Sequence, residues 1–384
     1  MKVLVVGGTG VISTAVVNEA VNQNIDVTCI NRGNNYGQHS NPQAKVLHFD
    51  VRNLEVAQQH LKNTFYDVVV DFVCYNLDHL NKSLELFHDK CSQYVFISTD
   101  SVYKLRKDGH YDEDCEQSNP EWAYSYEKAD CEKYLIDYCT EHHLTYTIVR
   151  PSITYGNTRI PYGLMPLYGY HYTLIERIKA GKPIVTWNNG QNYQTMMRVE
   201  DFATVMVGLW GNNLAYNQAV GICGESSRWS DVLDTIDHIL GVTSIRVDVP
   251  IENMIRFYPK KRGEIIIDRA EDHIVSNDKM KKIVPSYKMN YSLHDGLNKT
   301  IKYYQNNNNV LGIDYKFDGQ IDSLLHMSGN YNLKFVNYEK TNYFSNYRHY
   351  LYGRYGHLKC VFIIEKSERA VNKIIRLAKK LFHI

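Results

Sequence analysis

A tyrosine and a lysine four positions apart are the residues of this chain whose types and spacing best suit chemistry. They are Tyr124 and Lys128, in the stretch AYSYEKADCEKYL. On a helix this spacing places both side chains on one face, one turn apart. An ammonium near a phenol favours the phenolate, so Tyr124 could act as an acid or base near neutral pH although a free phenol titrates near ~10. The chain has 31 tyrosines, so the spacing alone carries little weight.

The segments around this pair strengthen the prediction. ISTDSVY, residues 97–103, precedes it, ends a predicted strand and offers the hydroxyl of Thr99. VRPSITYG, residues 149–156, follows it at the end of the next predicted strand. Asp100, next to Thr99, is a candidate substrate ligand, or it satisfies backbone N–H groups of the turn.

A glycine-rich turn at the start of the chain is the second candidate site. Gly7, Gly8 and Gly10 follow the apolar run KVLVV and precede the helical pattern TAVVNEAV. Such a turn allows a pyrophosphate to approach the backbone, and the helix N-terminus supplies N–H groups to bind it. Glycines also end strands for structural reasons. Here the strand, turn and helix context favours a dinucleotide site, with Ser13 where the usual pattern has a third glycine.

The end of the second predicted strand bears on which dinucleotide binds. It reads Asn31-Arg32-Gly33 and lacks the acidic residue that usually binds the ribose hydroxyls of NAD. Arg32 could pair with a 2′-phosphate, which slightly favours NADP over NAD, or it is a solvated turn residue. Asp50, after the third strand, could accept a hydrogen bond from the adenine amino group or cap the next helix.

The elements that would position these residues alternate between strands and helices. Short runs rich in Val and Ile are typical of strands buried on both faces. They are KVLVVG (2–7), DVTCIN (26–31), KVLHFD (45–50), DVVVDFV (67–73), QYVFIS (93–98) and TYTIVRP (145–151). The helical stretches between them predict right-handed crossovers and an α/β, Rossmann-type, doubly wound parallel sheet. Such sheets bind ligands at the carboxyl ends of their strands.

The composition narrows the class of protein further. Lys plus Arg number 43 and Asp plus Glu 42, for a net charge of +1, so no overall field favours nucleic acid. The eight cysteines lack metal-ligand spacing, which predicts reduced thiols, a cytoplasmic chain and no structural zinc or other metal. The apolar start is too short for a signal peptide, and no run approaches the ~18 apolar residues of a spanning helix.

Together these segments resemble an extended short-chain dehydrogenase/reductase of the NAD-dependent epimerase/dehydratase family. The resemblance runs from residue 1 to about 304 and includes the glycine turn, INRG, ISTDSVY, the Tyr124 and Lys128 pair, VRPSITYG, MMRVEDFATVMVGLW and YSLHDGLNKTIKYY. GGTGVIS, NRG, VVVDFV and IVPSY are similar to a bacterial branch of sugar-nucleotide epimerase-like proteins.

The resemblance implies a site and a reaction. Thr99 and Tyr124 would hold a substrate hydroxyl, Lys128 would also bind the nicotinamide ribose, and hydride would pass between a sugar carbon and the nicotinamide. The substrate would be a nucleotide-linked sugar, in surface polysaccharide or nucleotide-sugar metabolism. The implied cofactor-binding residues are Gly7, Gly8, Thr9, Gly10, Val11, Ile12, Asn31, Arg32, Asp50, Val51, Phe72, Tyr124, Lys128 and Pro151.

Two departures from the family pattern limit the prediction. Many members have GDGxQxRDF, whose arginine grips the nucleotide diphosphate, but this chain has Gln194 and Thr195 at the Arg-Asp positions. Gln194 with Arg262 is the predicted substrate contact, and Arg269 is an alternative. The 4,6-dehydratases of the family carry an acid pair after the active-site threonine, whereas here Ser101 follows Asp100. Epimerisation or keto-sugar reduction is therefore favoured over dehydration.

The expected domain organisation follows the resemblance. Residues 1–156, completed by about 195–225, form the cofactor-binding core, and 157–194 with 226–304 form a substrate lobe. Residues 305–309 (QNNNN) read as a linker. Residues 310–384 form an extension outside the resemblance, and its part up to residue 365 reads as short strands or irregular structure.

The last residues predict a basic amphipathic helix. In SERAVNKIIRLAKKLFHI, which starts at Ser367, apolar residues share one face and lysines and arginines lie largely elsewhere. We expect this helix to pack on the protein or on a second subunit, with a homodimer expected, and peripheral contact with an anionic membrane is the alternative. Two other functions stay open: reduction of a carbonyl metabolite that carries no nucleotide, and non-catalytic binding of RNA or protein, since some relatives with NRG bind RNA.

Overall fold

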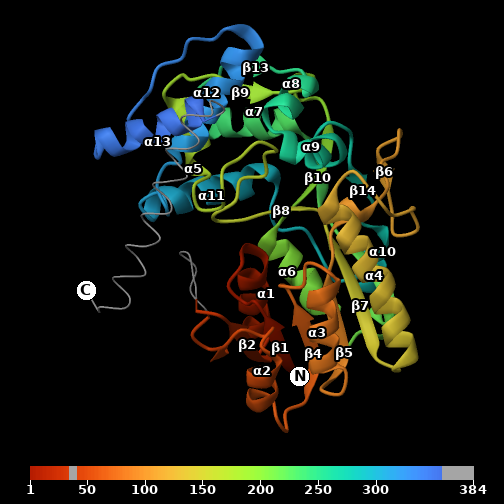
Figure 1. Ribbon diagram of the computed structural model, residues 1–384. Coiled ribbons are helices and arrows are strands. Elements are labelled where there is room, and N and C mark those ends of the chain that lie inside the picture. Colours follow the sequence, from red (N-terminus) through yellow and green to blue (C-terminus); the bar gives the residue numbers. More distant parts are fainter. Residues whose placement is uncertain (34–40, 357–384) are drawn as a thin grey trace.

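The computed structural model describes residues 1–33 and 41–356. These residues form two lobes, one above the other in Figure 1. The lower lobe contains the large sheet and most of the first half of the chain. The upper lobe contains most of the second half, and helices from the extension form its top.

The lower lobe is built on a seven-stranded parallel sheet. Its strands are β1 (Lys2–Val6), β2 (Asp26–Asn31), β3 (Lys45–His48), β4 (Tyr66–Asp71), β5 (Cys91–Ile97), β7 (Thr145–Pro151) and β11 (Gln218–Ile222). They are ordered β11-β7-β5-β4-β1-β2-β3, and each pair of neighbours is parallel. The predicted doubly wound sheet is confirmed.

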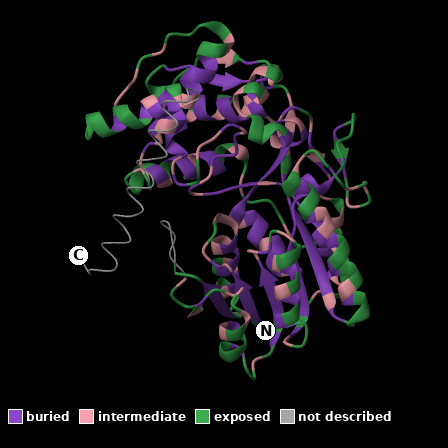
Figure 2. Ribbon diagram, viewed as in Figure 1, coloured by how far each residue is buried: buried purple, intermediate pink, exposed green. Residues whose placement is uncertain are grey.

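Helices cover both faces of this sheet. One face packs against α1 (Val11–Asn22), α6 (Val199–Gly208) and α10 (Asp278–Ile283), and the other against α2 (Leu54–His60), α3 (Leu77–Phe87) and α4 (Ala123–Glu141). Because side chains alternate along a strand, Val3 and Val5 join the first core, whereas Leu4 and Val6 join the second. This two-sided burial, visible in Figure 2, explains why the strands are continuous apolar runs.

The strand order reverses between β1 and β4. Connections from β1 lead outward to β2 and β3, whereas later strands extend the sheet the other way. At such a point the loops diverge and leave a crevice outside the carboxyl ends of the strands. The glycine turn follows β1, and Thr99 follows β5, so both lie at this edge of the sheet.

The upper lobe combines small sheets with helices. Its strands are β8 (Ile153–Tyr155), β10 (Tyr193–Arg198) and β12 (Glu225–Arg228) in one sheet, β9 (Ile184–Thr186) with β13 (Arg246–Asp248), and β6 (His110–Tyr111) with β14 (Ile274–Val275). Its helices are α5 (Tyr172–Lys179), α7 (Trp229–Leu240), α8 (Ile251–Phe257), α9 (Arg262–Glu264) and α11 (Leu293–Asn306), and residues Ile265–Arg269 form a π-helical turn.

Most of the described part of the extension, residues 310–356, lies in two helices, so the prediction of strands or irregular structure is wrong for residues 315–329 and 343–355. Helices α12 (Tyr315–Gly329) and α13 (Tyr343–Tyr355) pack against each other, and residues from both belong to the same apolar core as α5, α7 and α11. Helix α11 ends at Asn306, so the first two residues of the predicted linker 305–309 are helical. The predicted basic helix that starts at Ser367 lies outside the described residues.

Four buried charges join the extension to the upper lobe. Arg177 of α5 contacts Asp318 and Asp322 of α12 at 2.6 Å, and Lys182 contacts the same two carboxylates at 2.7 Å. The hydroxyl of Tyr338 also donates to Asp318, and that of Tyr350 to Asp322. Two cations and two anions therefore neutralise one another inside the core, the condition under which buried charges are tolerated.

Two further properties of the described part bear on the class of protein. None of its helices is both long and apolar enough to cross a membrane. Its seven cysteines carry free thiols.

Candidate active site

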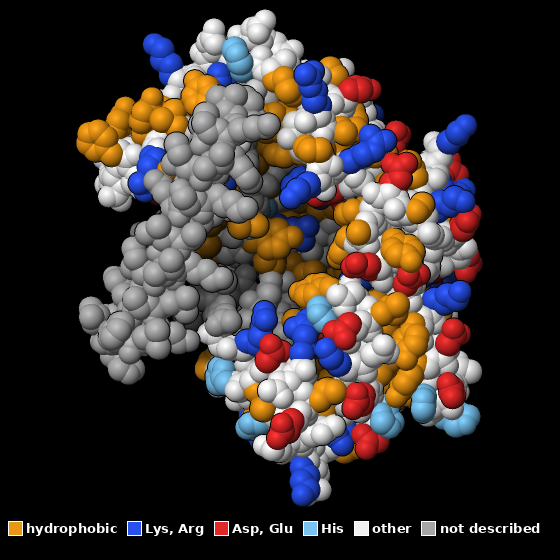
Figure 3. All heavy atoms as spheres, in the orientation of Figure 1, with side chains coloured by type: hydrophobic (Ala, Val, Ile, Leu, Met, Phe, Trp, Pro, Cys, Tyr) orange, Lys and Arg blue, Asp and Glu red, His pale blue; other side chains and the backbone are white. Residues whose placement is uncertain are grey.

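A cavity of about 1040 Å³ lies between the two lobes, at the carboxyl ends of the sheet strands. Figure 3 shows this face of the molecule hollowed between the lobes. The cavity brings together thirteen of the fourteen predicted cofactor residues and both Thr99 and Asp100. The exception is Gly8, which packs against β2, where a Cβ would lie 2.8 Å from the sulfur of Cys29.

The glycine turn has the close backbone packing that a phosphate cradle requires. Gly7 has φ +84°, and a Cβ there would lie 2.5 Å from Val73. Ser13, in the position of the third glycine, donates its hydroxyl proton to the carbonyl of Gly7 at 2.6 Å and accepts the N–H of Gly10 at 2.8 Å. Serine thus closes the turn by hydrogen bonds, and helix α1 begins at Val11 with its N-terminus at the cavity.

The outer end of the cavity is lined by two arginines. Arg32 is exposed, and Arg52, which the sequence did not indicate, donates to the carbonyl of Val73 at 2.5 Å and lies 4.0 Å from Asp50. Asp50 accepts the N–H of Arg52. The alternative that Asp50 caps the next helix is wrong, because the N-cap of α2 is Asn53.

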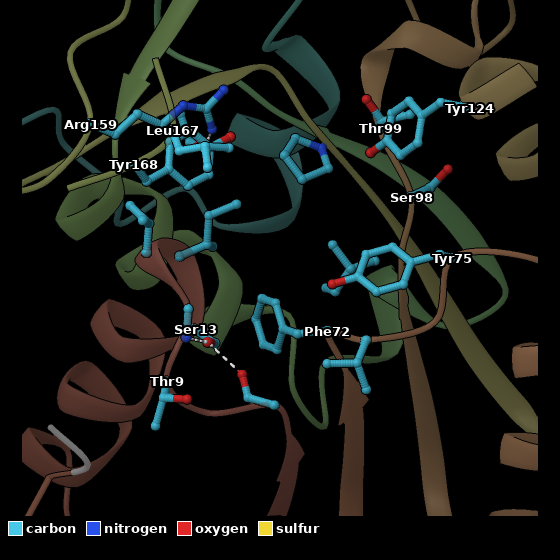
Figure 4. A pocket seen from close by; sticks show the side chains of 18 of the residues that line it. Thr9, Ser13, Phe72, Tyr75, Ser98, Thr99, Tyr124, Arg159, Leu167 and Tyr168 are labelled. Carbon is cyan, nitrogen blue, oxygen red and sulfur yellow. Dashed lines mark hydrogen bonds between the residues drawn. The ribbon is translucent and has the colours of Figure 1, made fainter. Parts of the chain in front are cut away.

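Thr99, Tyr124 and Lys128 all line the cavity. Figure 4 shows Thr99 and Tyr124 close together, and the Thr99 hydroxyl is near enough to the phenol to lower its pKa. Thr99 also accepts the N–H of Ser101 at 3.2 Å, which fixes its hydroxyl at the end of β5. Lys128 is buried and donates to the carbonyls of Cys74 at 2.5 Å and Ile97 at 2.7 Å. These bonds hold its ammonium between the ends of β4 and β5.

Buried polar contacts set the position of α4, which carries Tyr124 and Lys128. Glu132 of this helix pairs with Arg150 of β7 at 2.7 Å and accepts the hydroxyl proton of Ser98. At the N-terminal end, Ser125 donates to the carbonyl of Ser101 at 2.6 Å. The helix is therefore tied to the loop after β5 as well as to the sheet.

The surroundings of Tyr124 favour the protonated phenol in the protein without cofactor. Burial raises the pKa of Tyr124 to about 12, the nearby hydroxyl of Thr99 opposes this rise, and the charges of Asp100 and Asp268 add to it. Lys128, whose own pKa is lowered by burial, donates to two carbonyls and does not overcome these effects. The phenol is therefore protonated at neutral pH in the protein without cofactor, although 38% of Tyr124 is exposed to the cavity.

Two carboxylates lie near Tyr124, each beside a basic side chain. Asp100 faces the buried imidazole of His273 at 3.4 Å, and Asp268 pairs with Arg269 at 2.7 Å. Burial raises the pKa of Asp268 to about 6, while Arg269 opposes the rise. Burial alone would lower the pKa of His273, but Asp100 raises it. The sequence held no signal for Asp268 or His273, because they come from a distant segment that folding brings to β5.

The predicted substrate contacts Gln194 and Arg262 are not brought to the cavity. Gln194 is fully buried in β10 and donates to the carbonyl of Glu271, and Arg262 is an exposed residue 3.6 Å from Glu121. Arg269, the alternative, does line the cavity. The sequence also missed Arg159, Leu167 and Tyr168, which lie opposite Thr99 and Tyr124 in Figure 4. It missed as well Val310 and Leu311, which line the cavity, with Leu311 against Gly169.

Comparison with known proteins agrees with this architecture. The model of the NAD dependent epimerase/dehydratase family matches residues 3–219. The chloroplast stem-loop binding protein of 41 kDa b of Arabidopsis thaliana is 24% identical over 77% of each chain. The dTDP-glucose 4,6-dehydratase of Bacillus anthracis, solved with NAD, has a TM-score of 0.65 at 21% identity and covers 80% of this chain and 97% of its own. The UDP-glucose 4-epimerase of Thermotoga maritima, solved with UDP-glucose, has a TM-score of 0.63 at 19% identity. The match covers 80% of this chain and 99% of the epimerase.

Proposed function

Because the chain belongs to the NAD dependent epimerase/dehydratase family, we propose that it epimerises or reduces a nucleotide-linked sugar by hydride transfer to or from a nicotinamide dinucleotide. The observation that carries this proposal is the meeting of Thr99, Tyr124 and Lys128 in a cavity that also contains the glycine turn. The two solved relatives support the classes of ligand, since one is described with NAD and the other with UDP-glucose.

The residues present fit the dinucleotide. Gly7 lets the turn pack closely against Val73, where a Cβ would lie 2.5 Å from the side chain, and the N-terminus of α1 lines the cavity beside this turn, which suits a pyrophosphate. The buried ammonium of Lys128 would meet the nicotinamide ribose. When bound, the nicotinamide supplies or accepts the hydride. At the other end of the cavity, Arg32 and the absence of a carboxylate at the end of β2 are the basis for preferring NADP, whereas the solved dehydratase of Bacillus anthracis is described with NAD.

In this mechanism Tyr124 moves the proton of the reacting hydroxyl. Thr99 would orient that hydroxyl, and Tyr124 would take its proton during oxidation or return it during reduction. A phenol that is protonated at neutral pH is ready for the reductive direction, in which it donates to the developing alkoxide. Epimerisation needs both directions on opposite faces of the sugar carbon, so the positive charge of the oxidised nicotinamide would have to favour the phenolate.

Two other functions are alternatives that the experiment described below distinguishes. Reduction of a carbonyl metabolite without a nucleotide would use the same Thr99 and Tyr124. The similarity to a stem-loop binding protein favours RNA binding as an alternative. Against it, the net charge of +1 gives no overall field that attracts nucleic acid, and the cavity contains Tyr124 and Lys128, which RNA binding would not need.

Tyr124→Phe tests the assignment. The change removes one oxygen, so we expect turnover of the substrate to fall by ~10²–10⁴-fold while cofactor affinity and melting temperature stay near those of the parent. Tyr126→Phe is the matched control, because Tyr126 lies on the same helix, is 47% exposed and does not line the cavity. The assay follows cofactor absorbance and product formation with UDP- and dTDP-linked sugars.

Three results would contradict the proposal. Full activity of Tyr124→Phe would remove Tyr124 from the chemistry. Turnover of free carbonyl compounds but of no nucleotide sugar would favour the carbonyl reductase. Tight RNA binding without any dinucleotide binding would favour the non-catalytic function.

A further inference from the structure

The wall of the cavity opposite Tyr124 combines a cation with exposed apolar side chains. The guanidinium of Arg159 lies 5.0 Å from the centre of the Tyr168 ring and donates to the hydroxyl of Thr154 at 3.0 Å. Neither contact neutralises its charge. Leu167 is 76% exposed, Tyr168 53% and Leu311 37%. A cation that forms no ion pair with the described residues, beside apolar surface in a cavity, suits a ligand with an anionic and an apolar part.

The C-terminal extension supplies part of this wall. Val310 and Leu311 line the cavity, and the N–H of Leu311 donates to the carbonyl of Gly169 at 3.2 Å. Gly169 has φ +91°, and a Cβ there would lie 2.7 Å from Leu311. The side chain of Leu311 therefore rests directly on the backbone next to Tyr168, in a place that only glycine leaves open.

The backbone that places these two residues is strained. Asn308, Asn309 and Val310 have φ +49°, +57° and +58°. Asparagine tolerates this region, but a β-branched residue there is an outlier and is strained. Hydrogen bonds on both sides hold this strained segment in place. The N–H of Asn309 donates to the carbonyl of Tyr304 at 2.7 Å, and the N–H of Asp314 donates to the hydroxyl of Thr173 at 2.9 Å. Such strain is typical of functional sites.

We propose that Arg159, Leu167 and Leu311 form the subsite for the nucleoside diphosphate of the substrate. The proposal rests on the proposed function and names the group that replaces the missing diphosphate arginine at position 194. The sugar lies between Tyr124 and Tyr168, whose phenols are close enough to influence each other electrostatically. The diphosphate meets Arg159, and the nucleoside covers Leu167 and Leu311. The extension is thus a specificity element of the active site.

Calorimetry with a nucleoside diphosphate and its nucleoside separates the two parts of the subsite. UDP, dTDP, GDP and ADP are first titrated into the parent protein, and the tightest binder is carried forward with its nucleoside. We expect Arg159→Met to weaken the diphosphate about tenfold to a hundredfold, to reduce its salt dependence, and to leave the nucleoside unchanged. Leu311→Ala should weaken both ligands about three- to tenfold.

Two controls match these variants. Arg106→Met removes an exposed arginine that pairs with Asp108, and Leu214→Ala removes an exposed leucine, and neither residue lines the cavity. Both should bind the ligands as the parent does. Dinucleotide affinity of every variant should stay within about twofold of the parent, which would show that the fold is intact.

The outcomes distinguish this proposal from the proposed function. Binding of no nucleoside diphosphate by the parent would overturn both. Binding by the parent that Arg159→Met and Leu311→Ala leave unchanged would overturn only the subsite. A loss in Arg159→Met without one in Leu311→Ala would overturn the part assigned to the extension.

Discussion

At the scale of single residues, chemical type and spacing predicted much of the site. Thr99, Tyr124 and Lys128 could be found because each follows a recognisable strand or shares a helix face, and the cavity does contain all three. Arg159, Asp268 and His273 could not be found, because their roles depend on contacts between segments far apart in the chain. Local spacing holds no information on such contacts.

The choice of cofactor is also made by single residues. If Arg32 reads a 2′-phosphate, NADPH should bind more tightly than NADH, and Arg32→Ala should reduce the preference by one to two decades, the value of a charge-assisted contact of ~1.5–3 kcal/mol. Calorimetry with both cofactors measures this. Arg106→Met, remote from the cavity, should keep the preference of the parent. Equal affinities of the parent for NADPH and NADH would refute the assignment of Arg32 to a 2′-phosphate.

At the scale of elements, the sequence predicted the sheet better than the extension. Predicted strands 26–31 and 145–151 coincide with β2 and β7, because strands buried on both faces are short apolar runs. Helix α12 was missed because its buried face carries Asp318 and Asp322, whose charges interrupt the apolar pattern of a helix. Only the partners Arg177 and Lys182, distant in sequence, make that face compatible with burial.

The contact between two loops can be tested by a pair of glycine variants. Gly169 and Gly181 both have positive φ, +91° and +67°, but a Cβ at Gly169 meets Leu311 at 2.7 Å, whereas one at Gly181 meets nothing within 4 Å. Gly181→Ala should therefore cost only the backbone strain, about 1 kcal/mol. Gly169→Ala should cost at least ~1 kcal/mol more and displace Leu311. Urea unfolding compares them, and equal losses would show that Leu311 does not rest on Gly169.

At the scale of the whole molecule, the extension is a structural part of the enzyme. Helix α12 shares the apolar core of the upper lobe, and the segment between α11 and α12 reaches the active-site cavity. The buried charges and the cavity wall are linked, because only residues 312–317 separate Leu311, which lines the cavity, from Asp318 of α12. Replacing one of the buried charged residues should therefore lower the affinity for substrate as well as the free energy of unfolding.

Asp318→Asn tests this connection. The change leaves two cations facing one anion in a buried place, so we expect a loss of ~3–5 kcal/mol of stability, against ~0.5 kcal/mol or less for Glu176→Gln, which breaks the exposed pair with Lys179. Melting temperature and urea unfolding measure the loss. At temperatures where the variant stays folded, nucleoside diphosphate affinity should fall while dinucleotide affinity holds.

The pH dependence of the same variant gives an independent check. Burial alone would raise the pKa of Asp318, but Arg177 and Lys182 lower it below 3.8. A carboxyl whose pKa is lower in the folded state stabilises the protein above its unfolded pKa, and this contribution is lost as the pH falls through the folded value. The parent should therefore lose stability below about pH 4, and Asp318→Asn should lose less over that interval. If the variant matches the parent in stability and in acid response, the buried charges do not hold the extension, and the cavity wall must be fixed by the apolar core alone.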